Sequence, residues 1–201
     1  NASLPKVGYS ASADRLTILT SVSLSSLDPY GYSSSPEYGI WNHITESLVE
    51  VDYIKMDYVG VLAESWEFQG KKWVFNLKKG ARFQDGSPFT AKDVIHSFQR
   101  LLNDKRSPQR YALTDITEMK AADDHTLILS TKLPTAVLLG RLGNRNILSK
   151  TAADKYGSEV DQHPTGTGPY KFVSWQRDGQ LVLTRNDDYW GPKAAIKEIV
   201  T

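Results

Sequence analysis

Two pairs of adjacent aspartates have a spacing that could suggest acid–base catalysis. They are Asp123-Asp124 and Asp187-Asp188, and a glycosidase needs two acids that flank the bond it cleaves. Side chains of adjacent residues in a turn point in different directions, however, and aspartates at such positions commonly shape the turn itself. We therefore expect turn-forming carboxylates at both places.

The sequence lacks the motifs that usually bind a metal ion or supply a catalytic nucleophile. The histidines are far apart in sequence and form no zinc-type pair on one helical face. His96 falls opposite Val94 and Phe98 at helical spacing, so we expect it to be exposed. No serine stands in a Gly-x-Ser-x-Gly elbow, and the absence of cysteine excludes disulfides, thiolate zinc sites and a cysteine nucleophile. We expect neither a metal site nor another cofactor.

The glycines of Gly166-Thr167-Gly168 could suggest a nucleotide-binding loop. The dinucleotide fingerprint needs a third glycine after two more residues, and Lys171 stands there. Because Pro164 and Pro169 flank the glycines, we expect the segment to shape a rigid crossing between two parts of the fold.

Aromatic and hydroxyl side chains offer the remaining candidates for ligand contact. Trp41 could give a ligand a flat apolar surface, or it could belong to the core with Ile44, which shares its helical stripe. Ser21 and Ser23 follow a predicted opening strand over residues 16–20, and ligands of open α/β sheets bind beyond the carboxyl ends of strands. Their hydroxyls and backbone amides could contact a ligand or only satisfy the backbone of the loop.

These candidates must be positioned by alternating strands and amphipathic helices. Strands alternate around Gly70, Thr90 can cap a helix with Asp93 in its first turn, and a second hairpin turns at residues 123–124. Further helices are predicted over residues 36–48, 134–142 and 149–156, and strands flank the turn at Asp178-Gly179. The closing stretch Ala195 to Thr201 alternates like a strand without a cap or turn, from which we expect the chain to be part of a longer protein.

The composition of the chain argues against nucleic-acid binding and against a membrane-spanning segment. The chain has 201 residues, 24 basic and 23 acidic, and a net charge of +1. The sequence has no long run of like charges that would attract nucleic acid or anionic lipid, so we expect no nucleic-acid partner. The longest apolar runs are a few residues, far below the roughly 20 needed to span a bilayer. No membrane span is expected.

Two signatures give the chain a family resemblance. Residues 62–94, from Leu-Ala-Glu-Ser-Trp to Thr-Ala-Lys-Asp-Val, form the first, and residues 164–172 with the later Arg185-Asn186-x-x-Tyr189-Trp190 box form the second. Together with Ser26-Leu27-Asp28-Pro29, they resemble the family 5 extracellular solute-binding proteins, the peptide, nickel and oligosaccharide receptors of ABC importers. The resemblance covers roughly residues 15–201.

The resemblance implies a mixed α/β fold, a type II periplasmic-binding-protein-like first lobe with an inserted α+β subdomain. Residues 1–35 and 160–201 would form the discontinuous first subdomain, residues 36–159 the inserted one, and a missing second lobe would attach beyond Thr201. Ligand would lie in the crevice between lobes that close by hinge motion.

The resemblance also implies two further ligand-binding residues. Arg145 lies in a stretch that resembles the segment where the nickel-binding branch places an arginine on its ligand's carboxylates, and the guanidinium fork suits that role. An exposed loop arginine is the alternative. Tyr111 is similar in position to an aromatic that faces the cleft in several branches, although aromatics commonly pack in cores.

The implied function is non-enzymatic capture of a small polar solute, a peptide or a related carboxylate-bearing compound, for delivery to ABC permease subunits. We expect an exported monomer in the periplasm or at the cell surface, with lipid anchoring left open. A hydrolase that acts on peptides or sugars through carboxylates near Asp187 is the alternative, and a third is an interaction module that keeps the scaffold for signalling or chaperoning.

Overall fold

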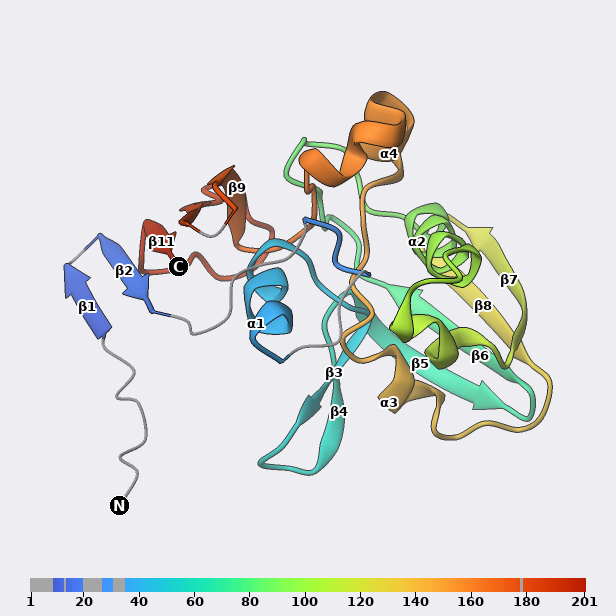
Figure 1. Cartoon of the computed structure of the whole chain (residues 1–201). Coiled ribbons are helices and arrows are strands. Elements are labelled where there is room, and N and C mark those ends of the chain that lie inside the picture. Colours follow the sequence, from blue (N-terminus) through green and yellow to red (C-terminus); the bar gives the residue numbers. More distant parts are fainter. Residues whose placement is uncertain (1–8, 13, 20–26, 31–34, 178) are drawn as a thin grey trace, which may run out of the picture.

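Two separate sheets organise the computed structural model, which describes residues 9–12, 14–19, 27–30, 35–177 and 179–201 (Figure 1). The larger sheet has five strands. In spatial order they are β1 (Tyr9–Ser12), β2 (Arg15–Ile18), β11 (Glu198–Val200), β10 (Leu181–Arg185) and β9 (Tyr170–Trp175). All neighbours are antiparallel except β2 and β11, which run parallel. The sheet therefore joins the two ends of the chain.

The second sheet carries the larger core. Its four strands are, in spatial order, β5 (Ala63–Gln69), β6 (Lys72–Leu77), β8 (Thr126–Thr131) and β7 (Ile116–Asp123). The predicted alternation is confirmed in β6, where Trp73, Phe75 and Leu77 are buried. On the edge strand β5, Phe68 is 40% exposed, because no further strand covers that side. Gly70 makes the predicted turn with a φ of 69°.

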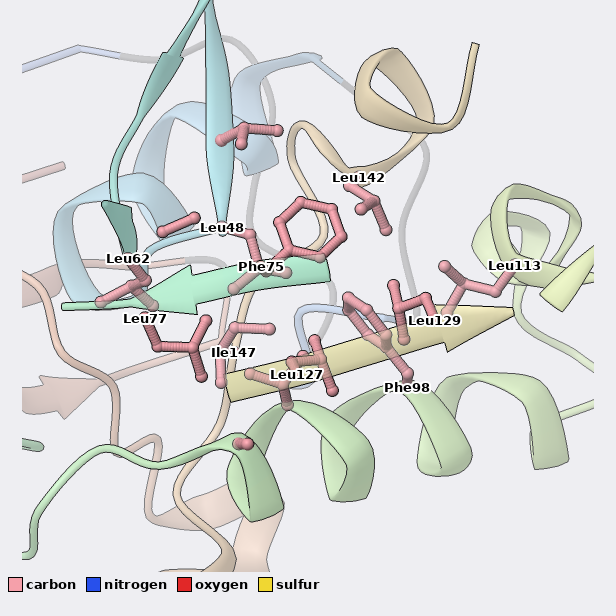
Figure 2. Close-up of a cluster of buried hydrophobic side chains, with 14 of the residues drawn as sticks. Leu48, Leu62, Phe75, Leu77, Phe98, Leu113, Leu127, Leu129, Leu142 and Ile147 are labelled. Atoms are coloured by element: carbon pink, nitrogen blue, oxygen red, sulfur yellow. The ribbon is translucent and has the colours of Figure 1, made fainter. Parts of the chain in front are cut away.

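Helix α2 (Ala91–Asn103) covers one face of this sheet, as Figure 2 shows. Its stripe of Val94, Phe98 and Leu101 is buried against the sheet, which confirms the predicted helical spacing. The predicted start is also confirmed, because the Asp93 carboxylate accepts hydrogen bonds from the amide and hydroxyl of Thr90, each at 2.9 Å.

Shorter elements complete this part of the fold. They are the hairpin β3 (Val49–Asp52) and β4 (Asp57–Gly60), the 3-10 helices η1 (Pro108–Leu113) and η2 (Gly157–Gln162), and the helices α3 (Leu138–Leu142) and α4 (Lys150–Tyr156). β3, η1 and α3 contribute side chains to the larger core, whereas α4 packs against α2. Sequence reasoning missed β1, the β3–β4 hairpin and both 3-10 helices. It also predicted residues 134–142 as one helix, whereas α3 begins only at Leu138.

Helix α1 (Ser35–Ile44) packs with the five-stranded sheet. Ile40, Trp41 and Ile44 share a smaller core cluster with Tyr170 of β9, so α1 packs with this sheet rather than with the rest of residues 36–159. Leu48, predicted on the same stripe, lies beyond the end of the helix and belongs to the larger core. The helix ends earlier than predicted.

A crossing at Gly166-Thr167-Gly168 connects the two parts. A Cβ on Gly166 would lie 2.2 Å from the carbonyl oxygen of Ile44, and one on Gly168 would lie 2.6 Å from the carbonyl oxygen of His43. These positions need glycine because two backbones touch. The Gln84 side-chain amide adds a clamp, since it donates to the carbonyl oxygens of Ile44, Gly168 and Tyr170.

No helix in the described ranges is long and apolar enough to cross a membrane.

Candidate functional site

Arg145 lies in a tight turn just after α3. Asn144 has a φ of 62°, in the left-handed region, and turns the chain so that the Arg145 amide donates to the Leu142 carbonyl at 3.0 Å. The half-buried guanidinium uses Nη1 to donate to Gln109 Oε1 at 2.7 Å. Its Nε is buried and has no hydrogen-bond partner in the described part of the chain. Arg145 is therefore held on one side and retains unused donors.

Gln109 connects Arg145 to a second segment. It is 4% exposed in η1, and its Nε2 donates to the Pro29 carbonyl at 2.7 Å. Tyr111, two residues further along η1, is 78% exposed. The structure thus brings the turn at Arg145 and the helix that carries Tyr111 together, although 36 positions separate Arg145 from Gln109.

The residues Leu27 to Tyr30 are fixed against the same region. The Tyr30 hydroxyl donates to the Asn146 carbonyl at 2.6 Å, and Ser107 Oγ donates to the Tyr30 carbonyl at 2.6 Å. Asp28 pairs with Arg100 at 3.2 Å. These contacts hold residues 27–30 beside the turn that carries Arg145.

Burial changes the pKa values of Tyr30 and Asp28, two residues that fix this segment in place. Desolvation raises the pKa of Tyr30 far above its ordinary range, so its hydroxyl stays a hydrogen-bond donor. Desolvation also raises the pKa of Asp28, although the Arg100 guanidinium opposes the shift. Arg100 in addition pairs with Asp161 at 2.5 Å, which ties η2 to the same anchor.

Ser21 and Ser23 lie outside the described residues. Strands β2 and β11 are parallel neighbours, so their carboxyl ends lie at one edge of the sheet. Leu19, which follows β2, and Thr201, which follows β11, therefore both lie at this edge, where ligands of α/β sheets commonly bind.

Trp41 is placed in the core rather than on a ligand-facing surface. It is 1% exposed and packs among the apolar side chains of the smaller cluster, where Ile44 is also buried. The helical stripe that Trp41 shares with Ile44 packs with the sheet. Of its two sequence-based roles, the structure favours the core.

The paired carboxylates are engaged in turns and ion pairs. Asp187 lies 2.8 Å from both Arg185 and Lys193, and these cations hold the pKa of its exposed carboxylate below the ordinary value. Asp123 accepts a hydrogen bond from the amide of His125 at 2.7 Å, which lowers its pKa in the same direction. Neither arrangement resembles a general acid with a raised pKa.

The histidines differ from expectation at one position. His96 was expected to be exposed, but it is half-buried, and its Nε2 has no partner among the described atoms. Burial, Lys150 and Arg100 lower its pKa, so neutral imidazole is favoured. Helix α4 packs against α2 and brings Lys150 and Asp154 near His96, a neighbourhood that helix spacing alone could not reveal. Across the described residues, no group of three or more histidine, aspartate and glutamate side chains is arranged to hold a metal.

Glu46 is a residue that sequence reasoning missed. It is 7% exposed and accepts hydrogen bonds from the Tyr189 hydroxyl at 2.6 Å and from Trp190 Nε1 at 3.0 Å. Burial raises its pKa, opposed by these hydrogen bonds. The Tyr189-Trp190 pair was the available signal, since two polar aromatic tips need partners when they are packed.

Comparisons with known proteins find similarity to bacterial solute-binding proteins. The family model for bacterial extracellular solute-binding proteins, family 5 Middle, matches residues 57–201. The probable D,D-dipeptide-binding periplasmic protein DdpA of Escherichia coli K12 is 33% identical over 171 residues, which cover 81% of this chain and 33% of that protein. The glutathione-binding protein GsiB of Pectobacterium atrosepticum is 31% identical over 179 residues, 87% of this chain and 34% of that protein.

A solved structure of a periplasmic binding protein has a similar fold. The ABC transporter-associated periplasmic binding protein DppA of Helicobacter pylori, in complex with the peptide STSA, has a TM-score of 0.78 and 32% identity, covering 88% of this chain and 40% of that chain. The present chain spans about a third of the length of the two relatives above.

Proposed function

Because this chain belongs to the bacterial extracellular solute-binding proteins of family 5, we propose that it contributes the first lobe of a receptor for an ABC importer. The receptor captures a small polar solute, a peptide or a related carboxylate-bearing compound, and delivers it to permease subunits. The observation that carries the proposal is the 32% identity and shared fold with a receptor in complex with a peptide. The proposed receptor is a monomer exported to the periplasm or the cell surface.

Arg145 is the proposed contact for the ligand's carboxylate. Its second terminal nitrogen, for which the described residues provide no hydrogen-bond partner, is the donor left for a carboxylate, while Gln109 holds Nη1 from the other side. Tyr111 offers an exposed ring on the adjoining η1, and Ser21 and Ser23 precede the anchored segment. We assign these four residues to the proposed site, and Trp41 to the scaffold.

The proposal is tested by calorimetry on the full-length receptor. A panel of short peptides with a free carboxyl terminus should include binders, and their amidated forms should bind less well. The 201-residue chain alone should bind the same peptides weakly or not at all, because half of the enclosing walls would be absent. Tight binding to the short chain, or no binding to the full-length receptor, would contradict the proposal.

Arg145→Ala should weaken binding of free-carboxyl peptides by about 1.5–3 kcal/mol, the contribution of a hydrogen bond to a charged group. Binding of the amidated peptides should change much less. A matched control is Arg106→Ala, since the side chain of Arg106 is 92% exposed and, in the described part of the chain, forms an ion pair with the nearby Asp104 alone. Equal losses for free and amidated peptides would mean that Arg145 only supports the fold.

The hydrolase alternative gains no support from the described carboxylates. Asp187 is ion-paired with two cations and its pKa is lowered, whereas a general acid needs a raised pKa.

A further inference from the structure

The β3–β4 hairpin ends in an exposed apolar tip. Tyr53, Ile54 and Met56 are 78%, 96% and 80% exposed, respectively. Scattered apolar residues are normal on protein surfaces, but three large side chains within four positions form a patch that interfaces commonly use. In Figure 1 the hairpin extends away from both sheets, at the bottom of the view.

The tip is an ordered turn. Asp52 Oδ1 accepts hydrogen bonds from the amides of Ile54 and Lys55, each at 3.0 Å, and its other oxygen lies 3.5 Å from Lys55 Nζ. Met56 has a φ of 52°, a left-handed conformation that is unfavourable for any residue with a Cβ. The turn thus holds apolar side chains out in water at a conformational cost, which a solvent-facing turn would avoid with glycine.

One face of the hairpin is acidic. Glu50 pairs with Val59, and Asp52 pairs directly with Asp57. Alternate residues of a strand share a face, so these three carboxylates lie on the same side as Val59, which is 37% exposed. Lys55 neutralises Asp52, while no ion pair joins Glu50 or Asp57 to a cation within the described ranges.

The opposite face packs on the body of the protein. Tyr58 points to α3, since a Cβ on Gly140 would lie 2.7 Å from its hydroxyl oxygen. The acidic face and the apolar tip are therefore the free surfaces of the hairpin. Their charge disfavours an anionic lipid surface and disfavours pairing with the same face of a second copy.

We infer that the β3–β4 hairpin is a docking element for a protein surface with an apolar pocket bordered by lysine and arginine. The inference rests on the proposed function in one respect, because it identifies that surface with the permease of the importer. The apolar tip enters the pocket, and the carboxylates of Glu50 and Asp57 face the basic border. Such pairing of a desolvated centre with a charged rim is typical of protein interfaces.

The experiment uses the full-length receptor and the importer's permease–ATPase complex in nanodiscs of phosphatidylcholine. The double variant Ile54→Ser/Met56→Ser should weaken binding to the complex by about tenfold or more, as truncation of an interface centre does. Leu133→Ser, which removes a side chain that is 68% exposed elsewhere, should bind like wild type. Glu50→Gln/Asp57→Asn should flatten the dependence of binding on salt concentration.

Several results would overturn the inference: equal binding by the double variant, binding to empty nanodiscs that the variant loses, or self-association that the variant abolishes. A lower melting temperature of the full-length double variant would show that the receptor's own chain covers the tip, and would overturn it too. Peptide calorimetry is measured separately. If the double variant binds peptide normally and also binds the permease–ATPase complex like wild type, the docking inference is wrong while the proposed function stands.

Discussion

At the scale of single residues, Glu46 shows how a buried carboxylate can join distant segments. Its two acceptor oxygens bind the polar tips of Tyr189 and Trp190, which follow β10 more than 140 positions later. Water is excluded from the carboxylate, and desolvation is the largest cause of its raised pKa. The pair of aromatic donors offsets part of that cost.

This raised pKa predicts how stability depends on pH. Between the ordinary value of 4.5 and the higher folded value, the folded state binds more protons at Glu46 than the unfolded state does. The free energy of unfolding contributed by this group therefore falls as pH rises through that window, and is constant above it. Urea unfolding of wild type and Glu46→Gln between about pH 4 and 8 should show the wild type losing stability relative to the variant as pH rises.

The glutamine variant should also be less stable near neutral pH, by about 1–3 kcal/mol, because its amide has one acceptor oxygen for two donors. Glu64→Gln is the control, since Glu64 is an exposed glutamate on β5. A pH-independent difference between wild type and Glu46→Gln would show that Glu46 is not the titrating group.

At the scale of elements, Asp93 links the starts of two helices. It accepts from the amide and hydroxyl of Thr90 at the start of α2, and its second oxygen accepts from the amide of Lys150 at 3.0 Å, where α4 begins. Amides at a helix start otherwise lack partners. One buried carboxylate thus caps α2 and docks α4 on it.

Asp93→Ala should lower the free energy of unfolding by about 2 kcal/mol, since a cap is lost and buried donors are left unpaired. Lys92→Ala is the matched control one position away. The side chain of Lys92 is 68% exposed and pairs with Asp124 at 3.2 Å, so its removal should cost less than about 1 kcal/mol. Denaturant unfolding measures both, and equal losses would refute the linking role of Asp93.

The elements also show what sequence patterns can and cannot predict. The strands around Gly70 and helix α2 were predictable because their apolar residues repeat with periods of two and 3.6 over enough positions. The β3–β4 hairpin was missed because its four-residue strands are short and its turn carries apolar side chains instead of glycine. Arg145 was predicted as a candidate, but its contact with Gln109 depends on how η1 packs beside α3, which local periodicity does not encode.

At the scale of the whole molecule, the crossing at Gly166 and Gly168 holds the two sheets together. The Gly166 carbonyl accepts from the amide of Gln84, and the Gly168 amide donates to the Ile44 carbonyl at 2.9 Å. Glycine was predicted there as a shaper of a crossing, and the structure adds the reason, which is contact with the backbone at the end of α1.

Gly166→Ala should therefore destabilise the protein by about 1–3 kcal/mol, the usual cost of overpacking, because its Cβ meets backbone that cannot rotate away. Gly39→Ala is the control. Gly39 lies in α1 with no atom within 4 Å of an added Cβ, so alanine should be neutral or stabilise the helix by up to about 1 kcal/mol. Thermal unfolding of both variants measures the difference, and an unaffected Gly166→Ala protein would show that the backbones can separate.

The position of β11 in the five-stranded sheet has a consequence for synthesis on the ribosome. Among the described strands, β2 is hydrogen-bonded to β1 on one side and to β11 on the other, and β11 is hydrogen-bonded to β10 on its far side. The β1–β2 hairpin, although translated before the rest of the described chain, has no place in the sheet until residues 198–200 have left the exit tunnel. The four-stranded sheet and α2 are complete well before then, so they can fold on the ribosome while β1 and β2 wait for β11.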